Sequence, residues 1–168
     1  MKFPSYIMMA VVAAATAIFT LSSCDSLNDE RIPYAEVRLT FTTEGVWNIY
    51  GVAGATSSRR YIKSEHIPTD FPYTALDQTG WGGLLVVCDI MGDPQVYDLS
   101  CPVEMRRDVR IYIPADEVHA RCPQCESTYE VFTNYGVPLS GPAARNGYAL
   151  KRYHVVYGGP AEYLVITR

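Results

Sequence analysis

The stretch that decides the fold is Cys122-Pro123-Gln124-Cys125-Glu126-Ser127-Thr128-Tyr129-Glu130, and a related stretch, Cys101-Pro102-Val103-Glu104, begins twenty-one positions before it. Each Cys-Pro step predicts a tight turn whose thiol points inward. A Cys-x-x-Cys pair can bind an ion from a single turn, and a second turn can supply the remaining ligands. The two stretches therefore predict a metal site between two loops of a small β-domain.

From residue 34 onward, the sequence pattern predicts short strands and no long helix. Residues 84–90 are almost continuously apolar, which is typical of a strand buried on both faces, and residues 91–94 predict a turn after it. Residues 109–113 and 118–121 are expected to pair as a second hairpin. The pattern predicts one all-β domain over 34–168, a small antiparallel sandwich or barrel. The expected strands are 35–42, 46–52, 59–63, 84–90, 95–100, 109–113, 118–121, 128–133, 150–157 and 163–167.

The part from Leu84 to Arg168 resembles the Rieske iron–sulfur family. That family reads Cys-Pro-His in its first loop and Cys-Pro-x-His-Gly-Ser-x-Tyr-Asp in its second, followed by Gly-Pro-Ala and a returning strand. Here Gly141-Pro142-Ala143 follows the second loop. The resemblance implies a Rieske-like β-fold with a cluster-loop subdomain, the metal-loop half being 84–145. It also implies a 2Fe–2S cluster and electron transfer.

Two positions depart from the family pattern. Val103 stands where the first histidine should be and offers no lone pair, whereas Cys125 stands where the second should be and can bind metal. The histidines of the chain, His66, His119 and His154, fall outside both positions. Because Rieske centres need two histidines on one iron, an ordinary histidine-ligated cluster is not expected. A 2Fe–2S cluster on cysteines, a zinc ion or a single iron remain as alternatives.

Cys101, Cys122 and Cys125 supply three thiolates, and a tetrahedral ion needs a fourth ligand. Glu104 follows Cys101 by three residues, as Cys125 follows Cys122. Cys88 would add a thiol, but a hairpin that pairs it with about residue 97 leaves it roughly 13 Å along the strand from Cys101. His119, three residues before Cys122, is a further candidate. The candidates for the fourth ligand are therefore Glu104 and Cys88, and His119 is a less favoured third.

A metal-free alternative also fits the cysteine count. Without Cys24 the chain holds four cysteines, and an even number in an exported protein is typical of disulfides. Pairs between Cys101 and Cys122, or between Cys122 and Cys125, would staple the loops of a binding or structural module that carries no cofactor.

The first 23 residues predict a lipoprotein signal peptide. An apolar run from Ile7 to Phe19 ends in Leu21-Ser22-Ser23-Cys24, so Cys24 is the expected lipidation site. The run is shorter than the ~20 residues that a membrane span needs. Residues 24–33 are polar and predict a flexible tether. The protein is thus expected in the cell envelope, attached to a membrane through its N-terminal lipid.

Charge and motifs exclude several other functions. The formal net charge is −4, and −5 without residues 1–23, which hold Lys2 and no acidic residue. The chain has no basic cluster, so nucleic acid is not an expected partner. It has no serine-hydrolase, metalloprotease or paired-carboxylate motif, and a Rieske oxygenase would need a large second domain. We therefore expect no enzyme, and the sequence names no redox or envelope protein partner.

Overall fold

The computed structural model describes residues 27–158 and 162–168, and in them strands predominate. The expectation of an all-β, antiparallel domain is confirmed. The helical elements are the α-helices α2 (Glu44–Tyr50) and α3 (Gly141–Asn146) and a 3-10 turn at Lys63–Glu65. The strands are β1 (Val37–Phe41), β2 (Ser58–Tyr61), β3 (Gln78–Thr79), β4 (Leu84–Cys88), β5 (Pro94–Asp98), β6 (His119–Arg121), β7 (Thr128–Glu130), β8 (Val137–Pro138), β9 (Arg152–Tyr157) and β10 (Leu164–Thr167).

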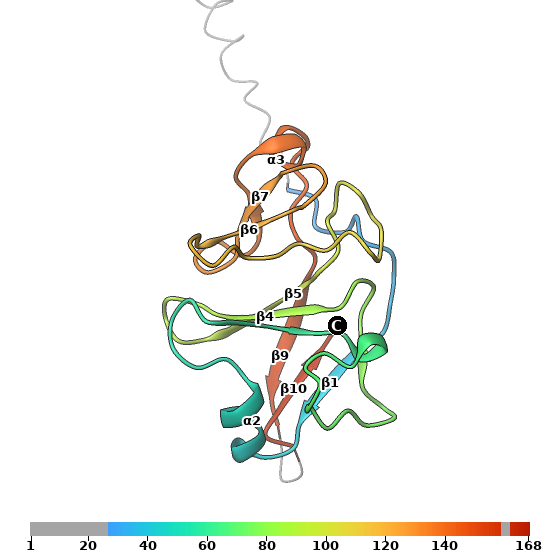
Figure 1. Cartoon of the computed structure of the whole chain (residues 1–168), viewed down its shortest axis with the longest axis vertical. Coiled ribbons are helices and arrows are strands. Elements are labelled where there is room, and N and C mark those ends of the chain that lie inside the picture. The colour runs from blue at the N-terminus through green and yellow to red at the C-terminus, as the bar shows by residue number, and fades with distance from the viewer. Residues whose placement is uncertain (1–26, 159–161) are drawn as a thin grey trace, which may run out of the picture.

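The strands form two antiparallel sheets. The larger has the order β2-β4-β5-β9-β10-β1-β3, and the smaller has the order β6-β7-β8. The large sheet is nearly closed, since the Lys63 N–H beyond β2 donates to the Thr79 hydroxyl of β3 over 3.2 Å. Figure 1 shows β6, β7 and α3 at one end of the molecule and the large sheet with α2 at the other. The small sheet lies within residues 84–145, but β4 and β5 of that range belong to the large sheet.

Strand β4 divides the interior into two cores. All five of its residues are buried, as the continuous apolar run predicted. Leu85 and Val87 face a core that also contains Cys101, Cys122 and residues of the small sheet. Leu84, Val86 and Cys88 face the second core, inside the large sheet. Because side chains alternate along a strand, β4 belongs to both cores and fixes one against the other.

The predicted strand over 46–52 is wrong, because the chain forms helix α2 there. The Thr43 hydroxyl caps this helix by accepting a hydrogen bond from the Val46 N–H over 3.1 Å. Val46, Trp47 and Tyr50 pack on the second core, a spacing that places them on one helix face. The aromatic and β-branched composition favoured a strand, and tertiary packing of that face overrides it.

Two predicted hairpins differ in register. Cys88 pairs with Pro94 at the end of the β4–β5 hairpin, so the turn is tighter than expected and residue 97 pairs with Leu85. The second hairpin reduces to β6 and a single bridge between Tyr112 and Arg121. Between these two bridge partners, residues 114–117 form a turn in which the Glu117 N–H donates to the Pro114 carbonyl over 3.2 Å.

The segment 24–33 is described from Leu27 on, and there it is bound to the domain instead of forming a flexible tether. Asn28 bridges to Tyr148, Ile32 is buried, and Glu30 pairs with Lys151. The Arg31 guanidinium stacks 4.0 Å above the Tyr148 ring. Cys24 and the predicted signal peptide lie outside the described residues. Among those that are described, no helix has the length and apolarity to cross a membrane.

Candidate metal centre

The cysteines lie on two turns of the same construction. We call residues 101–105 the first knuckle and residues 122–126 the second. In the first, the Met105 N–H donates to the Cys101 carbonyl over 2.8 Å; in the second, the Glu126 N–H donates to the Cys122 carbonyl over 3.2 Å. Met105 and Glu126 both adopt left-handed backbone, with φ of 53° and 57°. Each knuckle thus closes on its fifth residue, and in the second knuckle the first and fourth side chains, Cys122 and Cys125, reach the same cluster.

The two knuckles bring three sulfur atoms together. The sulfurs of Cys101, Cys122 and Cys125 lie within 4.8 Å of one another, and the Cys101 and Cys125 sulfurs are 3.6 Å apart. Cys101 and Cys122 are fully buried, and Cys125 is partly exposed. The cluster therefore sits at the edge of the first core, with one thiol toward the surface.

The hydrogen bonds at the cluster favour a thiolate at Cys101. The Cys122 thiol donates toward the Cys101 sulfur and, with the Tyr129 hydroxyl 3.4 Å away, lowers the pKa of Cys101 to about 5 against the opposing effect of burial. The same shared proton, together with burial, raises the pKa of Cys122. Burial also raises the pKa of Tyr129, so its hydroxyl keeps its proton and acts as a donor. One negative charge is therefore already accommodated at this site.

Helix α3 supports the second knuckle through Ser127. This buried serine accepts hydrogen bonds from the Ala143 N–H over 3.1 Å and from the Cys125 thiol over 3.2 Å. Gly141 lies so close that an added Cβ would come 2.8 Å from the Ser127 Cα. The Gly-Pro-Ala segment thus packs directly behind the cysteine loop.

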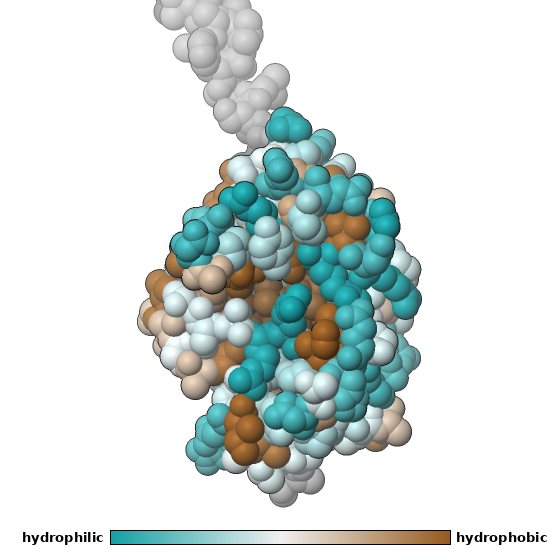
Figure 2. Space-filling model, in the orientation of Figure 1, coloured by the Kyte–Doolittle hydropathy of each residue, from teal (hydrophilic) through white to brown (hydrophobic). Residues whose placement is uncertain are grey.

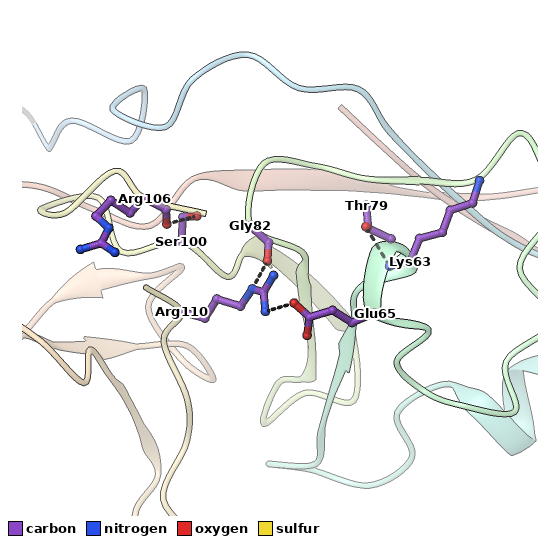
Figure 3. A network of polar contacts seen from close by, with 7 residues as sticks. All are labelled: Lys63, Glu65, Thr79, Gly82, Ser100, Arg106 and Arg110. Atoms are coloured by element: carbon purple, nitrogen blue, oxygen red, sulfur yellow. Dashed lines mark hydrogen bonds and ion pairs between the residues drawn. The ribbon is translucent and has the colours of Figure 1, made fainter. Parts of the chain in front are cut away.

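The first knuckle is attached to the large sheet by buried polar groups. The Asp98 carboxylate accepts hydrogen bonds from the backbone N–H groups of Trp81, Gly82 and Ser100 and from the Tyr153 hydroxyl. Beyond the knuckle, the Arg110 guanidinium bonds to the Gly82 carbonyl and the Glu65 carboxylate, each over 2.6 Å (Figure 3). The Ser100 hydroxyl also donates to the Arg106 carbonyl over 3.0 Å. The position of Cys101 is therefore fixed from both sides.

The remaining predicted ligands are not in this cluster. Cys88 lies in the second core, and burial raises the pKa of its thiol. His119 lies on β6 with its Nδ1 3.3 Å from the Glu130 carboxylate. Glu104 is half-buried on the first knuckle, and its carboxylate lies outside the group of three sulfurs. Val103 packs against the first core as an apolar side chain.

Sequence reasoning assigned no role to Ser127 and Tyr129. Both stand in the quoted stretch 122–130, and their alternation with Thr128 places them on the same face of the strand as it leaves the second knuckle. A serine and a tyrosine at that spacing after a Cys-x-x-Cys turn were the available signal for hydrogen bonds to the sulfurs.

A cleft of about 770 Å³ lies elsewhere, lined by β2 residues, Tyr112 and Ile113 and by no cysteine. The face of the molecule that Figure 2 shows is hollowed between its two ends, and apolar surface lies in the hollow. A molecule bound in this cleft would not contact the sulfurs.

The donor set fits one soft metal ion. With bonds of about 2.3 Å in tetrahedral geometry, two sulfurs on the same ion lie roughly 3.8 Å apart, near the 3.6 Å between Cys101 and Cys125. Sulfurs bound to different irons of a 2Fe–2S cluster lie further apart. The short distance between the Cys101 and Cys125 sulfurs therefore suits a single ion better than a two-iron cluster.

Among solved structures, the ferredoxin of carbazole 1,9a-dioxygenase from Nocardioides aromaticivorans IC177 is similar to this chain. The match covers 80% of this chain and 97% of that chain, at 15% sequence identity and a TM-score of 0.39. No protein-family model matches the chain, and no curated protein does.

Proposed function

We propose that this domain binds one zinc or iron ion through Cys101, Cys122 and Cys125. The observation that carries the proposal is the meeting of three sulfurs within 4.8 Å on two knuckles of equal construction. Thiolates select soft ions such as zinc and iron. Zinc would stabilise the two loops, and iron would in addition allow the domain to carry one electron. The 2Fe–2S cluster that the family resemblance implies has less support from the sulfur spacing.

The redox role has a direct test. Native protein that holds iron should show thiolate-to-iron absorption bands and a one-electron couple. Because no histidine is expected among the ligands, the potential should not change between pH 6 and pH 9. Protein that holds zinc should show no couple, and the role is then structural. A potential that falls as the pH rises would show that a histidine binds the ion and that the ligands are misassigned.

A disulfide is the second candidate, because the Cys101 and Cys125 sulfurs are only 3.6 Å apart. Closing the bond to about 2.05 Å would need a small shift of the second knuckle. Intact mass of the protein before and after reduction separates the candidates. A metal site leaves the mass of the unfolded chain unchanged on reduction, whereas each disulfide adds two hydrogens.

We further propose that the chain is a lipoprotein of the cell envelope, anchored by a lipid on Cys24. The support is the apolar run that ends in Leu21-Ser22-Ser23-Cys24. Changing Cys24 to Ala should block processing or release the protein from the membrane fraction, with Cys88→Ala as the control cysteine. Normal membrane retention of the Cys24 variant would contradict the proposal. Any electron transfer would take place with an envelope protein that contacts the two knuckles.

A further inference from the structure

The two knuckles match one another beyond their cysteines. The backbone N–H groups of Val103 and Glu104 face the Cys101 sulfur and help to lower the pKa of that thiol. In the second knuckle the N–H groups of Gln124 and Cys125 face the Cys122 sulfur in the same way. The second and third residues after each cysteine therefore hold the same place around its sulfur. Together with the equal closing bonds and left-handed fifth residues, this makes the knuckles equivalent position by position.

The equivalence pairs Glu104 with Cys125, since each is the fourth residue of its knuckle. The Cys125 side chain extends toward the first knuckle, so that its sulfur lies 3.6 Å from the sulfur of Cys101. The same relation predicts that the Cβ of residue 104 is directed toward Cys122. The three sulfurs can occupy three corners of a tetrahedron, and the relation places residue 104 at the fourth.

The Glu104 side chain is free to take that corner. It is half-buried, and among the described residues its carboxylate has no hydrogen-bond or ion-pair partner. A glutamate binds zinc through oxygen at about 2.0–2.2 Å. Its side chain is two bonds longer than that of cysteine, so the carboxylate must fold back to reach an ion.

We propose that Glu104 is the fourth ligand, so that the site is a three-thiolate, one-carboxylate centre. This inference rests on the proposed metal site and specifies its ligand set. The carboxylate oxygen would donate a lone pair to the ion in the fourth position, and the water that otherwise holds this position would be released. A carboxylate in place of a fourth thiolate makes the site harder than a four-cysteine site, and so shifts its preference from copper(I) toward zinc and iron(II).

The test uses Co²⁺ as the probe, added to the reduced, metal-free full chain in detergent. Thiolate-to-cobalt absorption grows with the number of sulfurs, and the visible bands report a tetrahedral ion. The wild-type spectrum should show three thiolates. Glu104→Cys should raise the thiolate absorption by about one third, and Glu104→Gln should weaken Co²⁺ binding by at least about tenfold. Glu126→Gln, which alters the exposed carboxylate next to Cys125, is the matched control and should bind as wild type does.

The outcomes separate the two claims. If wild type binds Co²⁺ while Glu104→Gln binds equally well and Glu104→Cys adds no thiolate absorption, the role of Glu104 is overturned and the three-cysteine site stands. If Glu126→Gln weakens binding as much as Glu104→Gln, the role is likewise overturned, because any nearby charge then suffices. If wild type binds no Co²⁺, the proposed function falls and the ligand role falls with it. Because Gln matches Glu in shape, the Glu104→Gln result does not depend on refolding of the knuckle.

Discussion

At the scale of single residues, the cysteine pattern predicted which thiols meet and could not predict their protonation. The spacing of Cys101, Cys122 and Cys125 was enough to expect a common site. The low pKa of Cys101 depends on Cys122 and Tyr129, which approach it from the other knuckle and from β7. Such contacts exist only after folding. For the same reason the half-burial of Glu104 and the separate core of Cys88 could not be predicted from the chain.

This protonation can be measured in the metal-free, reduced protein. One thiolate should appear in the ultraviolet absorbance with a midpoint well below the usual pKa of cysteine, where no tyrosine titrates. The sign follows from the cause: donors to sulfur stabilise the charged form, so the thiolate persists down to that midpoint. Cys101→Ser should abolish the transition, and Cys122→Ala should move it to higher pH because the donor to the Cys101 sulfur is lost. Absence of any thiolate below pH 7 in the wild type would contradict the described hydrogen bonds.

At the scale of elements, β4 was predicted correctly and α2 was not. A continuous apolar run of five buried residues has few alternatives to a central strand. Residues 44–50 are aromatic and β-branched, yet Thr43 caps a helix and the apolar residues recur at helical spacing. The capping threonine followed by Val46, Trp47 and Tyr50 was the overlooked signal. The β4–β5 register was missed by a few residues because the turn type depends on Gly92 at φ 95°.

Gly141, at the start of α3, provides a test of how that element supports the site. It has φ 75°, and an added Cβ would meet the Ser127 Cα at 2.8 Å. Gly141→Ala should therefore destabilise the fold by about 2–4 kcal/mol and also weaken metal binding. Gly54→Ala is the control, since Gly54 has φ 84° with nothing within 4 Å of the added Cβ, and should cost about 1–2 kcal/mol without affecting the metal. Equal effects of the two in urea unfolding and metal titration would contradict the close packing of α3 on Ser127.

At the scale of the whole molecule, two cores share β4, but the three clustered cysteines belong to only one of them. The first core joins both knuckles to the small sheet, and the second is closed by aromatic residues of the large sheet. Metal binding should therefore stabilise one end of the molecule more than the other. The overall class, an antiparallel β-domain, followed from strand spacing alone. The division into two cores depends on which face each β4 residue takes, and a run that is apolar on both faces does not reveal it.

Hydrogen exchange should detect this asymmetry. Structural zinc can contribute on the order of 10 kcal/mol to the folding of a small site. Chelation should then speed exchange of the Met105 and Glu126 amides by at least about a hundredfold. Amides that pair β1 with β10, such as those around Leu39 and Ile166, should change little. Uniform loss of protection across both cores would contradict a metal that acts on the first core.

The central claim is that three cysteines hold one ion, and its most direct test is the metal content of the full chain purified from its native compartment without added metal. Elemental analysis should give one zinc or iron per chain with no acid-labile sulfide. The ratio should be unchanged in Cys88→Ser and lost in Cys122→Ser. A chain with no metal and two fewer hydrogens than its reduced form, or one with two irons and two labile sulfides, would contradict the account.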